Sequence, residues 1–330
     1  MTGNKENYKE IIVVNKKDIR LDIFLHEHFD FLSRTKLKKI ILDDKVLING
    51  KPQSPSFILK GNEKIKCNFS VSQSSKVEII PEKIDLDIIY EDDYLIAINK
   101  PSGLIVHPGN GVKNGTLVNA LSYHFSNLSH VNDVSPGIVH RLDKETSGVI
   151  LVAKDDSTHW KLSKQFEDRT IKKVYRALIW GKIKDKEEVK GYIIRDRKNR
   201  IKFKLSLNNQ GRFSESKFKK IDYFPPLSYV EIYPKTGRTH QIRVHLESID
   251  HPIMCDTIYG GGIKKIKSYH MKYNNILKLI ISSINRVALH AYSIEIIHPQ
   301  TLEKMKFSAP IPNDFLSILN ILKESQDVKD

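Results

Sequence analysis

The sequence predicts an α+β fold, with a small domain at the amino end and a larger domain behind it. Strand-like apolar runs dominate from about residue 85 onward, and helical patterns lie between only some of them. The strict alternation of strand and helix that builds a parallel sheet is therefore missing. A length of 330 residues suits about two domains. The runs that indicate strands are residues 95–98, 149–153, 174–180, 201–207 and 229–233.

Order along the chain divides it into five parts. Residues 1–17 are expected to be a leader, and residues 18–69 a compact module. A linker rich in serine follows at 70–84, because such a composition does not build a core. The larger domain spans 85–312, and residues 313–330 form a helix with a polar tail.

The charge balance favours a polyanionic partner. Lysine and arginine number 54 against 39 aspartate and glutamate, for a formal net charge of +15. RNA, DNA and an anionic membrane all fit such a field, and so does a general compositional bias of the proteome. Charge by itself does not choose among them.

Cysteine usage and hydropathy indicate a soluble cytoplasmic protein. Cys67 and Cys255 are the two cysteines and lie far apart, which argues against a disulfide framework or a thiolate zinc site. The first ten residues are polar and charged, unlike a secretory signal. The longest apolar stretch, 277–284, is too short to span a bilayer, so we expect no membrane partner.

The amino-terminal module combines two helical patterns with a short strand and a tight turn. Apolar residues recur at helical spacing in 21–25 and again in 37–41, and the Asn49-Gly50 pair after 46–48 is a strong turn signal. The second helix carries a cationic group that we assign to RNA binding: Arg34, Lys36, Lys38 and Lys39. A cationic helix face can dock on phosphates, although a solvated lysine face gives the same pattern.

The order of these signals, from Arg20 to Asn62, resembles the alpha-L RNA-binding module, which is named after a small-subunit ribosomal protein. The resemblance covers roughly residues 18–66. Gly61-Asn62 departs slightly from the more usual Gly-Asp at its end. The resemblance implies binding to folded RNA through helix and backbone contacts.

A polar loop at 136–148, PGIVHRLDKETSG, precedes the buried strand predicted at 149–153. Asp143 stands in it among His140, Arg141 and Lys144. Neighbouring cations help to keep a carboxylate ionised, and an ionised carboxylate can act as a nucleophile or a base. For an isolated pattern of this kind, a surface salt-bridge loop is the ordinary interpretation.

The loop resembles the catalytic motif of the RluA-type pseudouridine synthases, and the resemblance extends over most of residues 85–312. Four further motifs match in the family's order: NKPSGLIVHPG at 99–109, YRA with Gly at 175–181, TGRTHQIRVH at 236–245, and ALHA at 288–291 followed by FSAPIP at 307–312. The family's fold has a mixed, largely antiparallel central sheet with flanking helices. Its members isomerise uridine to pseudouridine in RNA, without a cofactor.

The resemblance implies a role for individual residues. Asp143 aligns with the essential aspartate, Tyr175 with the tyrosine that stacks on the target uracil, and Arg243 with the arginine that pairs with the aspartate. Arg141 aligns with a residue that helps displace the target base. We assign further substrate-binding positions in the same motifs to His140, Arg238, His240 and Leu289. By pattern alone, Arg243 lies off the apolar face of a helix at 240–249, where most arginines are solvated.

The reaction needs no electron or group carrier, and the sequence has no phosphate-binding loop, dinucleotide fingerprint or zinc-binding cysteine pair. We expect no cofactor and no metal, and a monomer. The residues do not decide whether Asp143 attacks the sugar, attacks the ring or removes a sugar proton.

A second basic stretch lies at 195–204. Arg200, Lys202 and Lys204 alternate with apolar residues, which predicts a strand with one buried and one cationic face. Such a face could be an RNA track or a strand edge protected by lysines.

The VHPG variant at 106–109 looks most like the RluD branch, so we expect large-subunit ribosomal RNA as the target. A transfer-RNA target is the nearest alternative. A non-catalytic RNA-binding or ribosome-assembly factor fits less well, because Asp143 and Tyr175 are both present. A zinc-dependent base deaminase is disfavoured by the missing cysteine pair.

Overall fold

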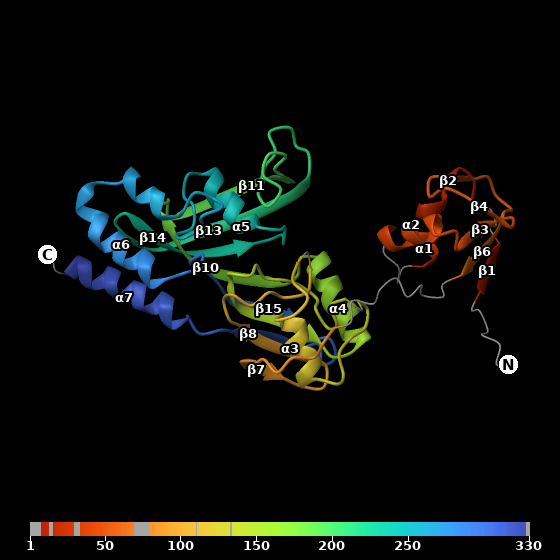
Figure 1. The fold of residues 1–330 in the computed structure, drawn as a ribbon, viewed down its shortest axis with the longest axis horizontal. Coiled ribbons are helices and arrows are strands. Elements are labelled where there is room, and N and C mark those ends of the chain that lie inside the picture. The colour runs from red at the N-terminus through yellow and green to blue at the C-terminus, as the bar shows by residue number, and fades with distance from the viewer. Residues whose placement is uncertain are drawn as a thin grey trace. The chain divides into compact units, whose positions relative to one another are not determined.

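The computed structural model describes residues 8–12, 16–29, 34–68, 79–109, 111–132 and 134–327. The chain separates into two compact units, residues 1–76 and 77–330, which are described one at a time (Figure 1). The boundary between the units falls inside the segment 70–84 that was expected to be a linker.

The amino-terminal unit packs two helices with small sheets. Its helices are α1 (Leu21–His28) and α2 (Arg34–Leu42), at the two predicted helical patterns. One sheet has the order β1-β6-β3-β4, and a second pairs β2 with β5. These strands are β1 (Tyr8–Ile12), β2 (Ile19–Arg20), β3 (Val46–Ile48), β4 (Lys51–Pro52), β5 (Ile58–Leu59) and β6 (Lys64–Asn68). The Asn49-Gly50 turn joins β3 to β4 with both residues at positive φ, the conformation that this pair tolerates best.

Residues 8–12 do not belong to a leader, in contrast to the expectation for residues 1–17. They form β1, which pairs antiparallel with β6 from Tyr8 opposite Asn68 to Ile12 opposite Lys64. Backbone hydrogen bonds to a partner strand do not require an apolar pattern in the added strand. The mixed sequence of this segment therefore did not indicate a strand. Residues 1–7 and 13–15 of the expected leader lie outside the described residues.

The larger unit is built on a ten-stranded sheet with the order β12-β11-β13-β14-β10-β15-β9-β8-β7 and with β16 paired to β15. β15 runs parallel to β9, whereas the other pairings among the described strands are antiparallel. The expected mixed, largely antiparallel sheet is confirmed. The strands are β7 (Ile88–Glu91), β8 (Leu95–Lys100), β9 (Ser147–Ala153), β10 (Lys172–Trp180), β11 (Lys186–Arg195), β12 (Phe203–Leu205), β13 (Arg212–Phe224), β14 (Leu227–Pro234), β15 (Leu289–Ile297) and β16 (Lys304–Ser308).

Helices flank this sheet in two groups (Figure 1). They are α3 (Leu117–His124), α4 (Asp156–Glu167), α5 (Gln241–Ser248), α6 (Asn274–Ser283) and α7 (Asn313–Asp327), with 3-10 turns at Ile263–Ser268 and Met271–Tyr273. α3 and α4 contribute to separate hydrophobic clusters with β8 and β9, which explains why β9 is buried along its whole length. None of the helices in the described part of the chain combines the length and apolar composition that a membrane span requires.

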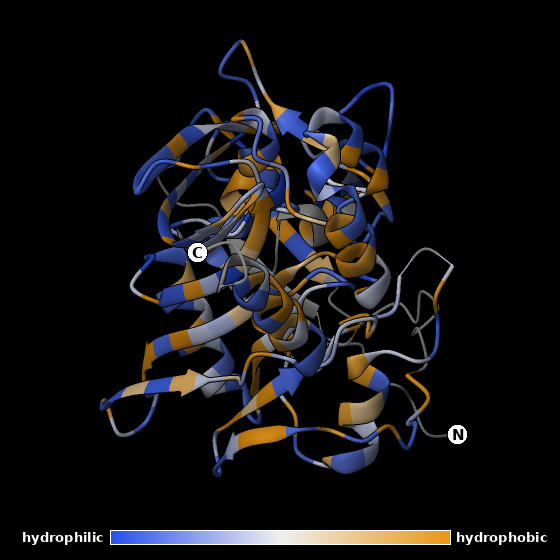
Figure 2. Ribbon diagram, turned by 90° about the vertical axis from the view of Figure 1, so that its left-hand side faces the viewer, coloured by the Kyte–Doolittle hydropathy of each residue, from blue (hydrophilic) through white to orange (hydrophobic). Residues whose placement is uncertain are grey.

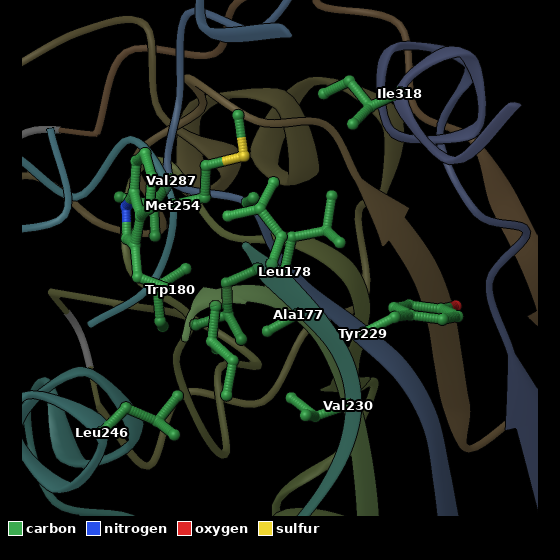
Figure 3. Packing of buried hydrophobic residues seen from close by; sticks show 14 of the residues in the cluster. Ala177, Leu178, Trp180, Tyr229, Val230, Leu246, Met254, Val287 and Ile318 are labelled. Carbon is green, nitrogen blue, oxygen red and sulfur yellow. The ribbon is translucent and has the colours of Figure 1, made fainter. Parts of the chain in front are cut away.

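The other half of the unit is held by the largest hydrophobic cluster, which joins β10, β13 and β14 to α5, α6 and α7. Figure 3 shows Leu178 and Trp180 of β10 in this cluster, together with Leu246 of α5 and Ile318 of α7. Along several strands hydrophobic and hydrophilic residues alternate, as Figure 2 shows, so the sheet presents an apolar surface to these helices.

The predicted strand at 201–207 is much shorter in the structure. Only Phe203–Leu205 form β12, which pairs with β11 at the end of the sheet. Ile201 is 62% exposed and Leu207 is 100% exposed, so the prediction of a continuous buried face was wrong at both ends. Phe203 and Leu205 are half-buried against Val244 and Tyr259, because α5 covers only the centre of this segment.

Candidate active site

One cavity brings together the three residues to which the sequence assigned catalysis. Asp143 comes from the loop before β9, Tyr175 from β10 and Arg243 from α5, and all three line a cavity of about 110 Å³. That volume is well above the roughly 10–15 Å³ that one water molecule needs. Segments separated by up to 100 residues therefore meet at one site.

The loop that carries Asp143 is held by a buried lysine of β8. The Lys100 ammonium donates to the carbonyl oxygens of Pro101, Leu104 and Lys144, at 2.8, 2.9 and 3.2 Å. An ammonium has three protons, so every donor is used. Burial lowers the pKa of Lys100 to about 7, although the negative charge of Asp143 opposes the shift. These bonds tie the segment 101–104 to the residue that follows Asp143.

A glycine lets β9 begin directly after the loop. Gly148 has φ +112° and lies in the parallel pairing of β9 with β15, where an added Cβ would meet the backbone of Ala291. Next to it, the Ser147 hydroxyl and the Nδ1 atom of His290 lie 2.9 Å apart. Only a small residue allows this approach of the two strands, which explains the glycine that ends the motif.

Arg243 joins two carboxylates on the buried side of the cavity, which we call its bottom. Its Nη1 donates to Asp143 Oδ2 at 3.2 Å, and its Nε and Nη2 donate to the two oxygens of Asp256 at 2.7 and 2.9 Å. Asp256 is fully buried and Arg243 is 6% exposed. Burial acts to lower the pKa of Arg243, but Asp256 and Asp143 raise it overall, so the guanidinium stays charged. A two-pronged pairing of this kind fixes the plane of the guanidinium.

The helix pattern alone had placed Arg243 among solvated arginines, and this expectation was wrong. α5 is buried on more than one side, because Ile242 and Leu246 enter the largest cluster while Val244 contacts Tyr259. Asp256 lies in none of the motifs that identified the other site residues. The one signal for it is an isolated carboxylate inside the otherwise apolar run PIMCDTIY at 252–259.

Tyr175 occupies a bulge in the middle of the sheet. It lies opposite Ile232 of β14 and Ala291 of β15, and the register with β15 shifts between Val174 and Tyr175. Bulges commonly redirect a side chain next to an active site. Burial and the negative charge of Asp143 both raise the pKa of Tyr175, so its phenol is protonated at neutral pH.

His240 lies at the start of α5, in a left-handed backbone conformation with φ +55°. Its Nε2 is 3.9 Å from Asp143 Oδ2, and its Nδ1 is 2.9 Å from the Tyr259 hydroxyl. That hydroxyl accepts the Phe203 N–H at 2.9 Å, so its own proton is available to Nδ1. Burial lowers the pKa of His240, although Asp143 opposes the shift, so the ring is neutral at neutral pH. This arrangement favours the tautomer whose Nε2–H faces Asp143.

Of the five predicted substrate-binding residues, four line the cavity and one does not. Arg141, Arg238 and Leu289 line the cavity with His240. Arg141 is exposed and donates from Nη1 to His107 Nε2 at 3.4 Å.

His140 does not line the cavity, in contrast to its predicted role. Its Nε2 accepts the Leu151 N–H of β9 at 2.9 Å, and its ring packs against Phe166 of α4 at 4.8 Å between centroids. Burial, aided by the charge of Lys173, lowers the pKa of His140 to about 3. A neutral histidine that bonds the neighbouring strand supports the loop rather than the substrate.

The predicted RNA-binding lysines differ in whether a carboxylate pairs with them. Lys202 lies 2.8 Å from Glu247 and Lys204 lies 3.5 Å from Asp196. Arg200 is exposed, and no ion pair to it is found in the described part of the chain. In the amino-terminal unit, exposed Lys38 lies 3.7 Å from Asp22. The side chains of Arg34, Lys36 and Lys39 lie outside the described residues.

The described residues contain no cluster of three or more His, Cys, Asp or Glu side chains arranged for a metal ion.

Comparison with known proteins identifies both units. The family model described as RNA pseudouridylate synthase matches residues 94–248, and the S4 domain model matches residues 19–65. Ribosomal large subunit pseudouridine synthase D of Neisseria meningitidis serogroup B is 38% identical over 304 residues, which cover 92% of this chain and 79% of the relative. The protein of the same name in Pseudomonas aeruginosa is 33% identical and is covered to 93% in both chains.

The fold comparison agrees with the sequence comparison. The solved structure of human RNA pseudouridylate synthase domain containing 4 is similar with a TM-score of 0.55 and 26% identity, over 72% of this chain and 93% of the human one. With relatives above 30% identity over most of both chains, and with every residue that lines the cavity except Leu289 inside the matched segment, the chain belongs to the RNA pseudouridylate synthase family, whose members isomerise uridine to pseudouridine in RNA, and it carries an S4 domain at its amino end.

Proposed function

We propose that this pseudouridine synthase modifies uridines of large-subunit ribosomal RNA, and that Asp143 is its essential carboxylate. The observation that carries the proposal is that Asp143 and Arg243 line one cavity, where the Arg243 guanidinium is held by the buried Asp256 carboxylate and donates to Asp143. The relatives named above are large-subunit ribosomal enzymes, which supports the choice of RNA.

The reaction breaks the bond between the sugar and uracil N1 and forms a new bond between the sugar and C5. The C5 proton leaves and N1 gains a proton, so no atom is added or lost. Asp143 could begin by attacking the sugar, attacking the ring, or removing a proton from the sugar, and each start requires an ionised carboxylate. Arg243 supports all three, because its positive charge lies 3.2 Å from the carboxylate.

Tyr175 and Arg141 serve the base in this proposal. An aromatic ring stacked on a base contributes about 1–3 kcal/mol, which suits Tyr175 as the wall of the cavity. Its raised pKa keeps the phenol protonated at neutral pH, so we assign it stacking and hydrogen bonding rather than removal of the C5 proton. Arg141 is exposed beside the cavity, where it can fill the space that an extruded uridine leaves.

We also propose that the enzyme works as a monomer in the cytoplasm. Residues of a single chain line the cavity with carboxylate, phenol and guanidinium together, so the site needs no second copy. The relatives named above are bacterial, and bacteria have no separate nuclear compartment.

The test is to map pseudouridine in large-subunit ribosomal RNA and transfer RNA from cells that carry the wild type or Asp143→Asn. We expect modified positions in the ribosomal RNA that the variant loses, with a fall in purified-enzyme rate of at least about 10⁴-fold. A variant that keeps the modification contradicts the role of Asp143. Loss confined to transfer RNA contradicts the proposed target and favours the alternative one.

A further inference from the structure

Two basic side chains line the active-site cavity, and the charges of two more, from separate segments, act on one of them. Arg169 follows α4, Lys173 lies near the start of β10, Arg212 begins β13, and Arg238 lies in the loop before α5. Lys173 and Arg238 line the cavity itself, whereas Arg169 and Arg212 are exposed. We call these four residues the rim cations.

Backbone contacts hold two of the rim cations in place. Lys173 Nζ donates to the Thr236 carbonyl at 3.3 Å. Arg238 Nε donates to the Phe213 carbonyl at 3.0 Å, which places its guanidinium beside the residue that follows Arg212. The two terminal nitrogens of Arg238 make no hydrogen bond within the described residues, so they remain available to an acceptor from outside.

The rim cations lie close enough to repel one another. Burial lowers the pKa of Lys173 to about 8, and the charge of Arg238 adds to the shift. Burial also lowers the pKa of Arg238, with further contributions from Arg212 and Arg169. Like charges held together in this way disfavour the protonated state, and a bound anion would relieve the repulsion.

No rim cation forms an ion pair with any carboxylate in the ranges that the structure describes, unlike Lys202 and Lys204 nearby in the sequence. The described residues therefore supply no anion for this cluster, and an RNA substrate can supply one. Arg238, Thr239 and His240 also lead into the amino end of α5, where backbone N–H groups favour negative charge.

We infer that the rim cations bind a backbone phosphate of the RNA next to the target uridine. This inference rests on the proposed function, because a uracil that enters the cavity brings its flanking phosphates to the cavity mouth. Lys173 and Arg238 hold that phosphate from the cavity wall, and Arg169 and Arg212 hold it from the surface. Such contacts position the nucleotide without reading its base.

The experiment measures binding of full-length protein to a large-subunit ribosomal RNA transcript at several salt concentrations, together with the rate of pseudouridine formation. We expect Arg169→Gln/Arg212→Gln to bind about tenfold more weakly and to lower the salt slope by up to about 0.7–0.9, the contribution of the one phosphate that the rim cations hold. KM should rise far more than kcat falls, because the lost contact holds ground state and transition state alike.

Two control variants isolate the effect. Lys306→Gln removes an exposed charge on β16 that does not line the cavity, and it should keep the wild-type slope. Arg169→Lys/Arg212→Lys keeps both charges and should retain most of the slope. A wild-type slope in Arg169→Gln/Arg212→Gln, or an equal loss in Lys306→Gln, would overturn the inference.

The two proposals fail in different ways. A wild type that forms no pseudouridine in the transcript contradicts the proposed target, while the salt slopes still test the rim cations. A wild type that forms pseudouridine, with no change of slope in the glutamine variant, contradicts the phosphate site alone.

Discussion

Charged groups at the bottom of the cavity form ion pairs, whereas the rim cations form none among the described residues. At the bottom, Arg243 is buried and pairs with both Asp143 and Asp256. At the rim, Lys173 and Arg238 face other cations and have no carboxylate partner among the described residues. The difference indicates that the groups assigned to the chemistry are arranged before RNA arrives, whereas the rim is completed by the substrate.

Apart from the loss of Asp143 itself, the largest expected effect concerns the geometry of the ion pairs at the bottom of the cavity. Arg243→Lys keeps the positive charge but cannot donate two parallel bonds to Asp256. We expect kcat to fall by about 10²–10³-fold, as for the loss of a fixed donor at a reacting centre. Steady-state rates on the ribosomal transcript measure it. A lysine variant within fivefold of wild type would show that charge alone suffices.

Substitution of Asp256 tests whether the position of Arg243 depends on a carboxylate that does not line the cavity. Asp256→Asn leaves Arg243 short of one buried charge, and breaking a buried pair typically costs about 3–5 kcal/mol. We expect a lower melting temperature and a kcat reduced about tenfold or more, since a slightly displaced group slows the reaction.

The matched control for Asp256 is Asp314, which forms a similar two-pronged pair with Arg286 at 2.6 and 2.8 Å and does not line the cavity. Asp314→Asn should also lower the melting temperature but should keep kcat near wild type. Equal losses of kcat in both variants would mean that stability, not the position of Arg243, explains the result.

Buried neutral histidines predict a loss of stability in acid. Burial lowers the pKa of His140 to about 3, and lowers the pKa values of His245 and His290 to about 4. Between about pH 6.5 and 4 these histidines bind protons in the unfolded chain but stay neutral in the folded chain. The free energy of unfolding therefore falls as pH falls. Each histidine contributes up to about 3 kcal/mol. Thermal melting across this range measures the fall, and a flat profile would refute it.

The smallest expected effect distinguishes paired from unpaired cations outside the rim. Arg200→Gln should weaken RNA binding about two- to threefold and lower the salt slope by about 0.7–0.9. Lys202→Gln should change both less, because Lys202 is already partly neutralised by Glu247 at 2.8 Å. Equal effects from the two substitutions would show that a carboxylate partner does not predict which cations contact RNA.

Much of the fold and of the site could be predicted, because it follows from patterns among residues that are close in the sequence. The helices at 21–28 and 34–42, the buried strand after the Asp143 loop, and the mixed sheet follow from short-range patterns and motif order. The long strands β11 and β13 were not anticipated. Charged and polar residues interrupt their alternation, and neighbouring strands rather than their own pattern hold them in the sheet.

The chain's own order of residues determined the family, the S4 domain and the segments that supply Asp143, Tyr175 and Arg243. The tertiary structure alone decided which groups meet. It paired Arg243 with Asp256, turned His140 toward β9, and gave the rim cations no carboxylate partner among the residues that the structure describes. The physical reason is that burial and charge pairing depend on neighbours distant in sequence, which no local pattern encodes.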